Sequence, residues 1–530
     1  MTSDGRLGAP RRDVIAAIVA VMSLLPLVAM AKLMVASFDI TDEGYYLLAM
    51  AEPRADSATV QFFGWVLHPL WTLAGADLVA VRLASGLIGW AAFALMAWSV
   101  LRLAEALGFP PLSRTLRAAL AIGIGSGSMA LLPMFPLSPG YALVAACGLA
   151  LTVGATSAAW RRPDRWWWWC LAGTATALTF LGKPTTGVLW ALLTAGCIGI
   201  AGAPRVRTLG LYVAGGLGGM ATFLVAARLS PREFWRRFWS GYEYEMVLGG
   251  RDAGFLRWDP LPSSPTQYLP AAAGALALLA VGALAIDLVR HRHSTPARPW
   301  GRWVLVAGLV LAPLAAALGT NNNLWAAMGR FPAFWTLAAV LAVGALSRRW
   351  WSAALLTGLS LVLLTVQLGV GADLPYRQPP LQELSSSVEV RGSRVGATPS
   401  QAAAIQEMLE RSHGAGLTPG TPILDLTGSS PGVIYALGGR PVGRAWLLGG
   451  YRGSDAAAEN VLALAPCETA AAWVLWEPGS RALDPDVLLA VGRDLTRDFE
   501  KVASWSSLTA GTDALSTGLY RPLDPRPEAC

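Results

Sequence analysis

The stretch "VIAAIVAVMSLLPLVAMAKLMVA" (residues 14–36) runs directly into "SFDITDEGYY" (residues 37–46). The first part is 23 residues long with one charged side chain, Lys32, which is long and apolar enough to cross a bilayer as a helix. The second part places three carboxylates close to the membrane boundary, those of Asp39, Asp42 and Glu43. Ionisable groups so near lipid usually have a function, so this junction predicts both a membrane fold and the place of a site.

The composition of the whole chain agrees with a membrane protein. Of its 530 residues, 54% are hydrophobic and 14% are charged, and the mean hydropathy is +0.46. Ordinary soluble domains carry about 25% charged residues. Apolar runs recur up to residue 371, after which the composition becomes mixed and polar. We therefore expect a polytopic α-helical membrane domain over residues 1–371 and a soluble domain over residues 372–530.

Eleven apolar runs are expected to span the membrane. They lie near residues 14–36, 78–101, 116–133, 138–159, 166–182, 185–202, 209–228, 270–290, 303–319, 332–347 and 352–371. Arginines gather in alternate short connections, for example at residues 102–117, 161–165 and 205–207. Because cytoplasmic loops carry an excess of Lys and Arg, we predict a cytoplasmic N-terminus and an extracytoplasmic C-terminal domain in the plasma membrane. The net charge of +7 is then a topology signal, and no nucleic-acid partner is expected.

Three connections on the predicted outer side are longer or more polar than a link between helices requires. They are the outer loops at residues 37–77, 229–270 and 319–332. Long loops of this kind usually carry function, so the site residues are expected there.

The acidic start of the first outer loop has two interpretations. In one, Thr41 or Asp42 caps a helix that runs to Ala51, and the helix dipole stabilises the carboxylates of its first turn. In the other, the carboxylates act on a substrate at the membrane surface. These residues alone do not decide between the two.

Three short motifs here resemble a known enzyme class. Asp42-Glu43-Gly44-Tyr45-Tyr46 resembles the Asp-Glu motif in the first external loop of GT-C glycosyltransferases, such as protein O-mannosyltransferases and aminoarabinose transferases. His68-Pro69-Leu70 is similar to the His-Pro-Pro-Leu stretch of those families, with leucine in place of the second proline, and Arg82-Leu83-Ala84-Ser85 resembles the start of their second span. The resemblance implies a GT-C-like fold of about eleven transmembrane helices with a C-terminal extracytoplasmic α/β domain.

The resemblance also implies a reaction. Asp42 would be the general base of an inverting displacement, and Glu43 would orient an acceptor or assist a metal ion. The donor would be a polyprenyl-phosphate-linked hexose or pentose, and the acceptor a cell-envelope glycan, lipid or protein. Lys183, in the turn at residues 182–186, resembles the lysine of a loop found in many GT-C transferases and would receive the phosphate with an arginine. A membrane anchor that reaches the headgroups is the alternative interpretation of this lysine.

Further cations and polar side chains complete the predicted site. A helix opening at Ser230-Pro231 has aromatic rings on one face and arginines on the other, which is typical of an interfacial helix. The candidate phosphate ligands are Lys183, Arg82, Arg236, Arg237 and Arg330, with Arg251 and Arg257 also considered. The candidate substrate contacts are Tyr45, Tyr46, His68, Asn322 and Asn323, although the asparagines suit a plain turn equally well.

No cofactor is required by the sequence. A divalent cation such as Mg²⁺ or Mn²⁺ is compatible with the hard oxygen ligands of Asp42, Glu43, Glu243, Glu245 and Asp252, but their spacing does not demand one. The five cysteines lack metal-ligand spacing. If the tail is outside the cell, Cys467 and Cys530 either pair or stay free.

The tail alternates helix-like and strand-like segments. Residues 401–412 and 433–437 are helix-like, whereas "ILDL" (423–426) and "AAAWVLW" (470–476) are strand-like. This order predicts a small α/β domain with a largely parallel sheet. The domain either shapes the acceptor entrance or only stabilises the outer loops.

Two other kinds of function remain open at this stage. A membrane transporter would show paired repeats and ionisable groups near the middle of the bilayer, and neither is evident in the sequence. A non-catalytic glycan-binding envelope protein would bind sugar without turning it over. Retained donor hydrolysis or transfer distinguishes an enzyme from both.

Overall fold

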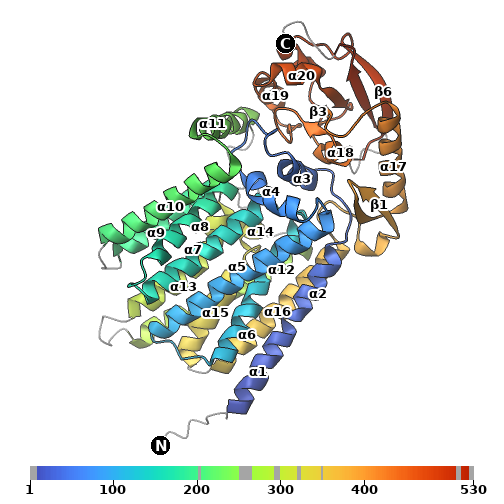
Figure 1. Cartoon of the computed structure of the whole chain (residues 1–530). Helices are drawn as coiled ribbons and strands as arrows, with labels where there is room; N and C mark the ends of the chain where they lie inside the picture. Colours follow the sequence, from blue (N-terminus) through green and yellow to red (C-terminus); the bar gives the residue numbers. More distant parts are fainter. Residues whose placement is uncertain are drawn as a thin grey trace, which may run out of the picture.

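The computed structural model describes residues 9–200, 205–249, 265–291, 299–318, 324–347, 350–508 and 515–524. It has two parts, a bundle of long helices and a C-terminal α/β domain that sits on one end of the bundle (Figure 1). Helix α1 lies at the end of the bundle remote from that domain (Figure 1). We call the end that carries the domain the upper end.

Each of the eleven expected spans falls on a helix or helix pair of the bundle. These are α1 (Ala9–Met22) with α2 (Leu24–Leu33), α5 (Leu78–Ala106), α6 (Arg114–Gly125) with η1 (Ser126–Met134), α7 (Tyr141–Arg161), α8 (Trp167–Gly182), α9 (Pro184–Ile200), α10 (Arg205–Ala227), α12 (Pro265–His291), α13 (Pro299–Ala317), α15 (Pro332–Ser347) and α16 (Trp350–Asp373). Within the described residues, six helices are long and apolar enough to cross a membrane, and four shorter ones are apolar. The protein is therefore a multi-pass membrane protein, as predicted.

Four helices at the upper end belong to the outer loops. They are α3 (Asp42–Ala51), α4 (Phe63–Leu73), α11 (Pro231–Leu248) and the short α14 (Leu324–Met328). Helix α3 starts at the predicted residue, but the carboxylate of Asp39 caps it by accepting from the backbone N–H groups of Thr41 and Glu43 at 3.0 and 3.2 Å. The prediction that Thr41 or Asp42 supplies the cap is wrong, because the side chain of Thr41 donates to Asp39 instead.

Helix α11 begins as its sequence predicts. The hydroxyl of Ser230 accepts from the backbone N–H of Glu233, and a proline occupies the first turn. Trp235 and Trp239 are 59% and 47% exposed, which suits rings that face lipid at the membrane surface. Phe234 instead stacks on Phe62, so one side of the aromatic face is packed against the protein.

The C-terminal domain is a five-stranded sheet with helices around it, preceded by a short hairpin. Its elements are η3 (Leu381–Glu383), β1 (Ser386–Val390), β2 (Ser393–Ala397), α17 (Pro399–Gly414), β3 (Pro422–Asp425), α18 (Pro431–Ala436), β4 (Arg440–Pro441), α19 (Ser454–Leu462), α20 (Pro466–Ala471), β5 (Trp473–Trp476), η4 (Pro485–Val491), β6 (Phe499–Ser506) and β7 (Ser516–Pro522). The sheet order is β4-β3-β5-β7-β6.

The expected largely parallel sheet is only half correct. Strand β3 runs parallel to β4 and β5, but β7 runs antiparallel to both β5 and β6. Strands β6 and β7 follow each other along the chain and pair as neighbours, which favours antiparallel pairing. Their polar, serine-rich sequence does not carry the apolar run that marks β3 and β5.

Close backbone contacts and hydrogen bonds from several segments hold the C-terminal domain against the bundle. The backbone N–H of Gly432 donates to the carbonyl of Ile40 at 2.7 Å, and a Cβ added to Gly44 would lie 2.2 Å from the nitrogen of Gly432. The hydroxyl of Ser393 accepts from the backbone N–H of Leu78 at 2.8 Å, and Gly396 donates to Val35. Helix α18 therefore packs backbone against backbone on α3, next to the acidic motif.

Candidate functional site

The carboxylate of Asp42 lies at the start of α3, beside the segment that follows the last span. Its Oδ2 accepts hydrogen bonds from the hydroxyl of Tyr376 at 2.8 Å and from the guanidinium of Arg377 at 2.6 Å. Arg377 also donates to the hydroxyl of Thr41 at 2.8 Å. The side chain of Asp42 is 23% exposed, so the carboxylate is held in position while remaining open to a substrate.

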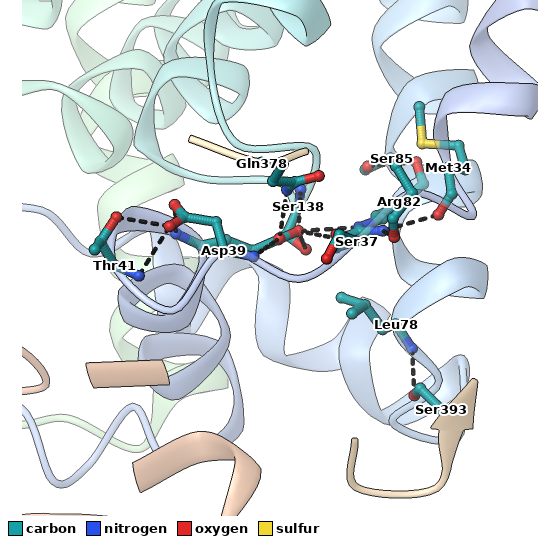
Figure 2. A network of polar contacts seen from close by, with 12 residues as sticks. Met34, Ser37, Asp39, Thr41, Leu78, Arg82, Ser85, Ser138, Gln378 and Ser393 are labelled. Atoms are coloured by element: carbon teal, nitrogen blue, oxygen red, sulfur yellow. Dashed lines mark hydrogen bonds and ion pairs between the residues drawn. The ribbon is translucent and has the colours of Figure 1, made fainter. Parts of the chain in front are cut away.

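Glu43, the neighbour of Asp42, has a different environment. Its carboxylate is fully buried and forms a 2.7 Å ion pair with Arg82, which is also fully buried. The same oxygen accepts from the backbone N–H and the hydroxyl of Ser138. The other oxygen accepts from the backbone N–H of Asp39 and the side-chain amide of Gln378. Figure 2 shows this network between the first outer loop, α5 and the segment before α7. Glu43 is therefore a structural anchor with no free lone pair directed at a substrate.

The prediction that Arg82 binds the donor phosphate is wrong. Its guanidinium donates two hydrogen bonds to the carboxylate of Glu43 and one to each of the backbone carbonyl groups of Met34, Ala36 and Ser37 (Figure 2). Because arginine has five N–H groups, none is left for a ligand.

Two other predicted contacts also serve the fold. Arg237 is buried, pairs with Glu233 at 2.8 Å and donates to the carbonyl groups of Arg54 and Asp56, so it ties α11 to the first outer loop. His68 lies within 2.8 Å of the carbonyl of Met50 through Nδ1, which joins α4 to α3. Arg236 is exposed on α11. The prediction that Arg237 contacts phosphate is not supported by these hydrogen bonds. His68 also lines the large cavity described below, so its contact with substrate stays a prediction.

Lys183 and Arg330 are the predicted cations that the structure brings together. Lys183 occupies the turn between α8 and α9, and Arg330 lies between α14 and α15; the two side chains line one small cavity with Phe135 and Tyr141. Both residues are at most 8% exposed. The Nζ of Lys183 donates to the carbonyl of Ala316 at 2.6 Å, and the guanidinium of Arg330 sits 3.8 Å above the ring of Phe135.

These two buried cations lack a compensating carboxylate among the described residues. Burial, followed by the neighbouring Arg330, lowers the pKa of Lys183 to about 7. Burial also lowers the pKa of Arg330, and the other groups acting on it are tyrosines, not acids. The Nε of Arg330 is buried without a hydrogen-bond partner in the described part of the chain. Two desolvated cations without a counter-charge form a site that favours an anion.

A layer of tyrosines connects these cations with Asp42. Tyr141 packs edge-on against Phe135 at 6.2 Å and against Tyr46 at 6.0 Å, measured between ring centroids. Burial raises the pKa of Tyr46, and Tyr141, Asp42 and Tyr376 act in the same direction, which places all of them around one ring. Tyr45 packs against Tyr46, Phe63 and Trp446. The arrangement thus has a carboxylate on one side, an anion site on the other and aromatic rings between them.

A large apolar cavity extends down the bundle from the upper end. Its volume is about 1030 Å³, and it is lined by α4, α5, α7, α8 and α10, following α8 from Trp168 to Leu181. Its charged and titratable lining residues all lie at its upper end: Glu52, Arg54, His68 and Arg228. An elongated apolar cavity with a polar mouth suits a lipid chain.

Some predictions fall outside the described residues. They are those for Asn322, Asn323, Arg251, Arg257, Asp252 and Cys530. Cys467 is disulfide-bonded, and Cys147, Cys170 and Cys197 are free. Within the described ranges no group of three His, Cys, Asp or Glu side chains is placed to hold a metal ion. The carboxylate of Glu43 is saturated by hydrogen bonds, and that of Glu245 pairs with Arg444, so neither fits the metal site considered from the sequence.

Tyr376 and Arg377 were missed by the sequence analysis. They stand in "LPYRQPP" (374–380), directly after the last span and at the assumed start of the soluble domain. The sequence did contain a signal for these residues, since polar and charged side chains stand between prolines at a membrane boundary. Gln378 of the same segment donates to Glu43 at 3.3 Å, so this short connection contacts both acidic residues.

Comparisons with known proteins give one match. No family model matches the chain, and no curated protein matches it. Among solved structures, the chain is similar to the crystal structure of ArnT from Cupriavidus metallidurans bound to undecaprenyl phosphate. The identity is 14%, the alignment covers 98% of this chain and 100% of that chain, and the TM-score is 0.43.

Proposed function

We propose that this protein is a membrane glycosyltransferase of the GT-C type that moves a sugar from a polyprenyl-phosphate-linked donor to an acceptor hydroxyl on the outer side of the membrane. The observation that carries the proposal is the buried cation pair of Lys183 and Arg330, which no carboxylate of the described residues compensates and which tyrosines separate from the carboxylate of Asp42. A donor phosphate would supply the missing negative charge.

The chemistry requires both sides of this arrangement. Asp42 accepts the proton of the acceptor hydroxyl while the acceptor oxygen forms a bond to the anomeric carbon of the sugar. The bond from that carbon to the phosphate oxygen breaks, and Lys183 and Arg330 stabilise the charge that develops on the phosphate. Attack from the side opposite the leaving phosphate inverts the anomeric carbon. The tyrosine layer and Phe135 provide faces against which a sugar ring packs.

A lipid-linked donor also agrees with the cavity in the bundle. The apolar walls along α8 and α10 give an isoprenoid chain a path beside the spans. Undecaprenyl phosphate, the ligand named for the ArnT crystal structure, is a lipid of this class.

The disulfide of Cys467 supports the orientation that the arginine distribution predicts. Disulfides persist in oxidising compartments and are rare in the cytosol. An extracytoplasmic C-terminal domain would place α3 and Asp42 on the outer side, because that domain packs directly on α3.

The first test is sugar transfer from radiolabelled polyprenyl-phosphate donors in membranes that contain equal amounts of wild type, Asp42→Asn or the control Asp373→Asn. Asp373 is an exposed carboxylate at the end of α16. We expect Asp42→Asn to reduce the transfer rate by about 10²–10⁴-fold, the usual contribution of a general base, and Asp373→Asn to keep it.

The two unfavourable results have different meanings. If Asp42→Asn transfers sugar at the wild-type rate, the base is another group. If the wild type consumes no donor, the glycosyltransferase proposal fails, and transport or glycan binding takes its place.

A further inference from the structure

A second large cavity lies at the junction of the C-terminal domain and the first outer loop. Its volume is about 800 Å³. Its walls are the loop at residues 38–41, the first two turns of α17, the segments that follow β3 and β5, and the end of β6. Strands β3 and β5 are parallel, so the cavity is at the carboxyl edge of the parallel part of the sheet. Ligands of open α/β sheets bind in this position.

Two turns of the same type lie at this cavity, one in the outer loop and one after β3. In the outer loop, Asp39 accepts from the backbone N–H and the hydroxyl of Thr41 at 3.0 and 2.7 Å. After β3, Asp425 accepts from the backbone N–H and the hydroxyl of Thr427 at 2.9 and 2.6 Å. Such Asp-x-Thr turns fix the local backbone. Since Gly432 also bonds to Ile40, the cavity is preformed across the two domains.

The chemistry of the lining is that of a sugar-binding site. Hydroxyl groups come from Ser400, Ser429, Ser480 and Ser506. The charged side chains of the lining are the carboxylates of Asp39 and Glu477 and the guanidinium groups of Arg377 and Arg481, so the two signs of charge balance. Glu477 is 4% exposed, and one of its oxygens accepts from Thr517 at 2.6 Å. Phe38 contributes a ring at the outer loop. Hydroxyl and carboxylate groups exchange hydrogen bonds with sugar hydroxyls, whereas a lipid chain would leave them unpaired.

Arg377 connects this cavity with the proposed base. It lines the cavity, and its guanidinium bonds to both Thr41 and Asp42. Thr41, which precedes Asp42 in the chain, also lines the cavity. A ligand that fills the cavity up to Arg377 therefore ends next to the carboxylate of Asp42.

We propose that this cavity binds the sugar units of a neutral saccharide acceptor and presents one of its hydroxyl groups to Asp42. The inference rests on the proposed function and specifies its acceptor class. A cavity of about 800 Å³ is within the range of roughly 300–1,000 Å³ that holds small ligands. The C-terminal domain is then the part of the protein that selects the acceptor.

The test uses the full-length protein in detergent, an array of neutral and anionic oligosaccharides, and two tryptophan variants. Ser480 is exposed and lines the cavity, so Ser480→Trp fills the cavity without disturbing a packed core. Ser385 is exposed in the same domain but does not line it, so Ser385→Trp is the matched control. We expect the wild type and Ser385→Trp to bind neutral oligosaccharides, and Ser480→Trp to bind them at least tenfold more weakly.

The second readout separates this inference from the proposed function. In each preparation, the rate of sugar transfer to the neutral oligosaccharide that binds most tightly is divided by the rate at which water hydrolyses the donor. Ser480→Trp is expected to lower this ratio at least tenfold relative to Ser385→Trp. An unchanged ratio, or binding restricted to anionic glycans, overturns the saccharide cavity while leaving glycosyl transfer intact. Failure of the wild type to consume donor overturns the proposed function itself.

Discussion

Two pairs of buried charged side chains differ in whether their charges and hydrogen bonds are satisfied by the described protein. In the first, Glu43 and Arg82 neutralise each other, and every N–H of the guanidinium has an acceptor. In the second, Lys183 and Arg330 have the same charge and no carboxylate among the described residues acts on them. Both pairs are at the upper end of the bundle, below the C-terminal domain.

The difference separates what builds the site from what operates it. A buried charge pair with all its hydrogen bonds satisfied gains nothing from a ligand, so its role is to hold α3 on α5. Buried cations without a partner cost free energy in the folded protein, and binding of an anion recovers that cost. We therefore expect substitutions in the Glu43–Arg82 pair to affect stability, and substitutions of Lys183 or Arg330 to affect function.

The largest expected effect comes from breaking the complete pair. Arg82→Met leaves the carboxylate of Glu43 buried without its counter-charge, which costs about 3–5 kcal/mol in comparable buried pairs. We expect a large fall in the melting temperature and in the yield of folded protein, measured by thermal unfolding in detergent. Arg236→Met, at an exposed position on α11, is the control. A melting temperature equal to that of the control would show that the network does not hold α3.

The opposite result is expected for the incomplete pair. Lys183→Met removes a buried cation that no carboxylate of the described residues neutralises, so the melting temperature should stay the same or rise. Donor consumption should fall by about 10²–10³-fold, the usual cost of losing one group that stabilises developing charge. Thermal unfolding and single-turnover donor cleavage measure the two effects. A loss of stability similar to that of Arg82→Met would mean that Lys183 also belongs to the structural frame.

The smallest expected effect is a pH dependence that follows from Lys183. With its pKa lowered from 10.5 to about 7, the amine is charged below pH 7 and mostly neutral above it. The KM for the donor should therefore rise above pH 7, by up to about tenfold per pH unit. The free energy of unfolding should rise over the same pH range, because between pH 7 and 10.5 the unfolded chain binds more protons than the folded one.

Lys183→Arg provides the check on this assignment. Its guanidinium stays charged over the whole range, so the rise in KM should disappear while some activity remains. A wild-type profile that is flat from pH 6 to 9, or an unchanged rise in Lys183→Arg, would assign the titration to another group.

Much of the fold was predictable because its signals are local. Each apolar run became a helix, and α11 begins at Ser230 because a capping serine followed by proline is a local signal. The pairing of β6 and β7 was not predictable, since their strands lack an apolar pattern and depend on each other for hydrogen bonds. In the site, the roles of Asp42 and Lys183 stay predictions, whereas Arg82 and Arg237 were given phosphate roles that their protein partners already fill.

The sequence by itself determined the apolar helices of the membrane part, the change to a mixed polar composition after residue 371 and the connections in which charged side chains gather. These follow from hydrophobicity and local capping, which act over a few residues. Only the tertiary structure decided that Arg82 is saturated and Arg330 is not, that Tyr376 and Arg377 bond to Asp42, and that α18 packs on α3. The physical reason is that the free energy of a buried charge depends on partners from distant parts of the chain, and only the folded protein brings those partners within hydrogen-bonding distance.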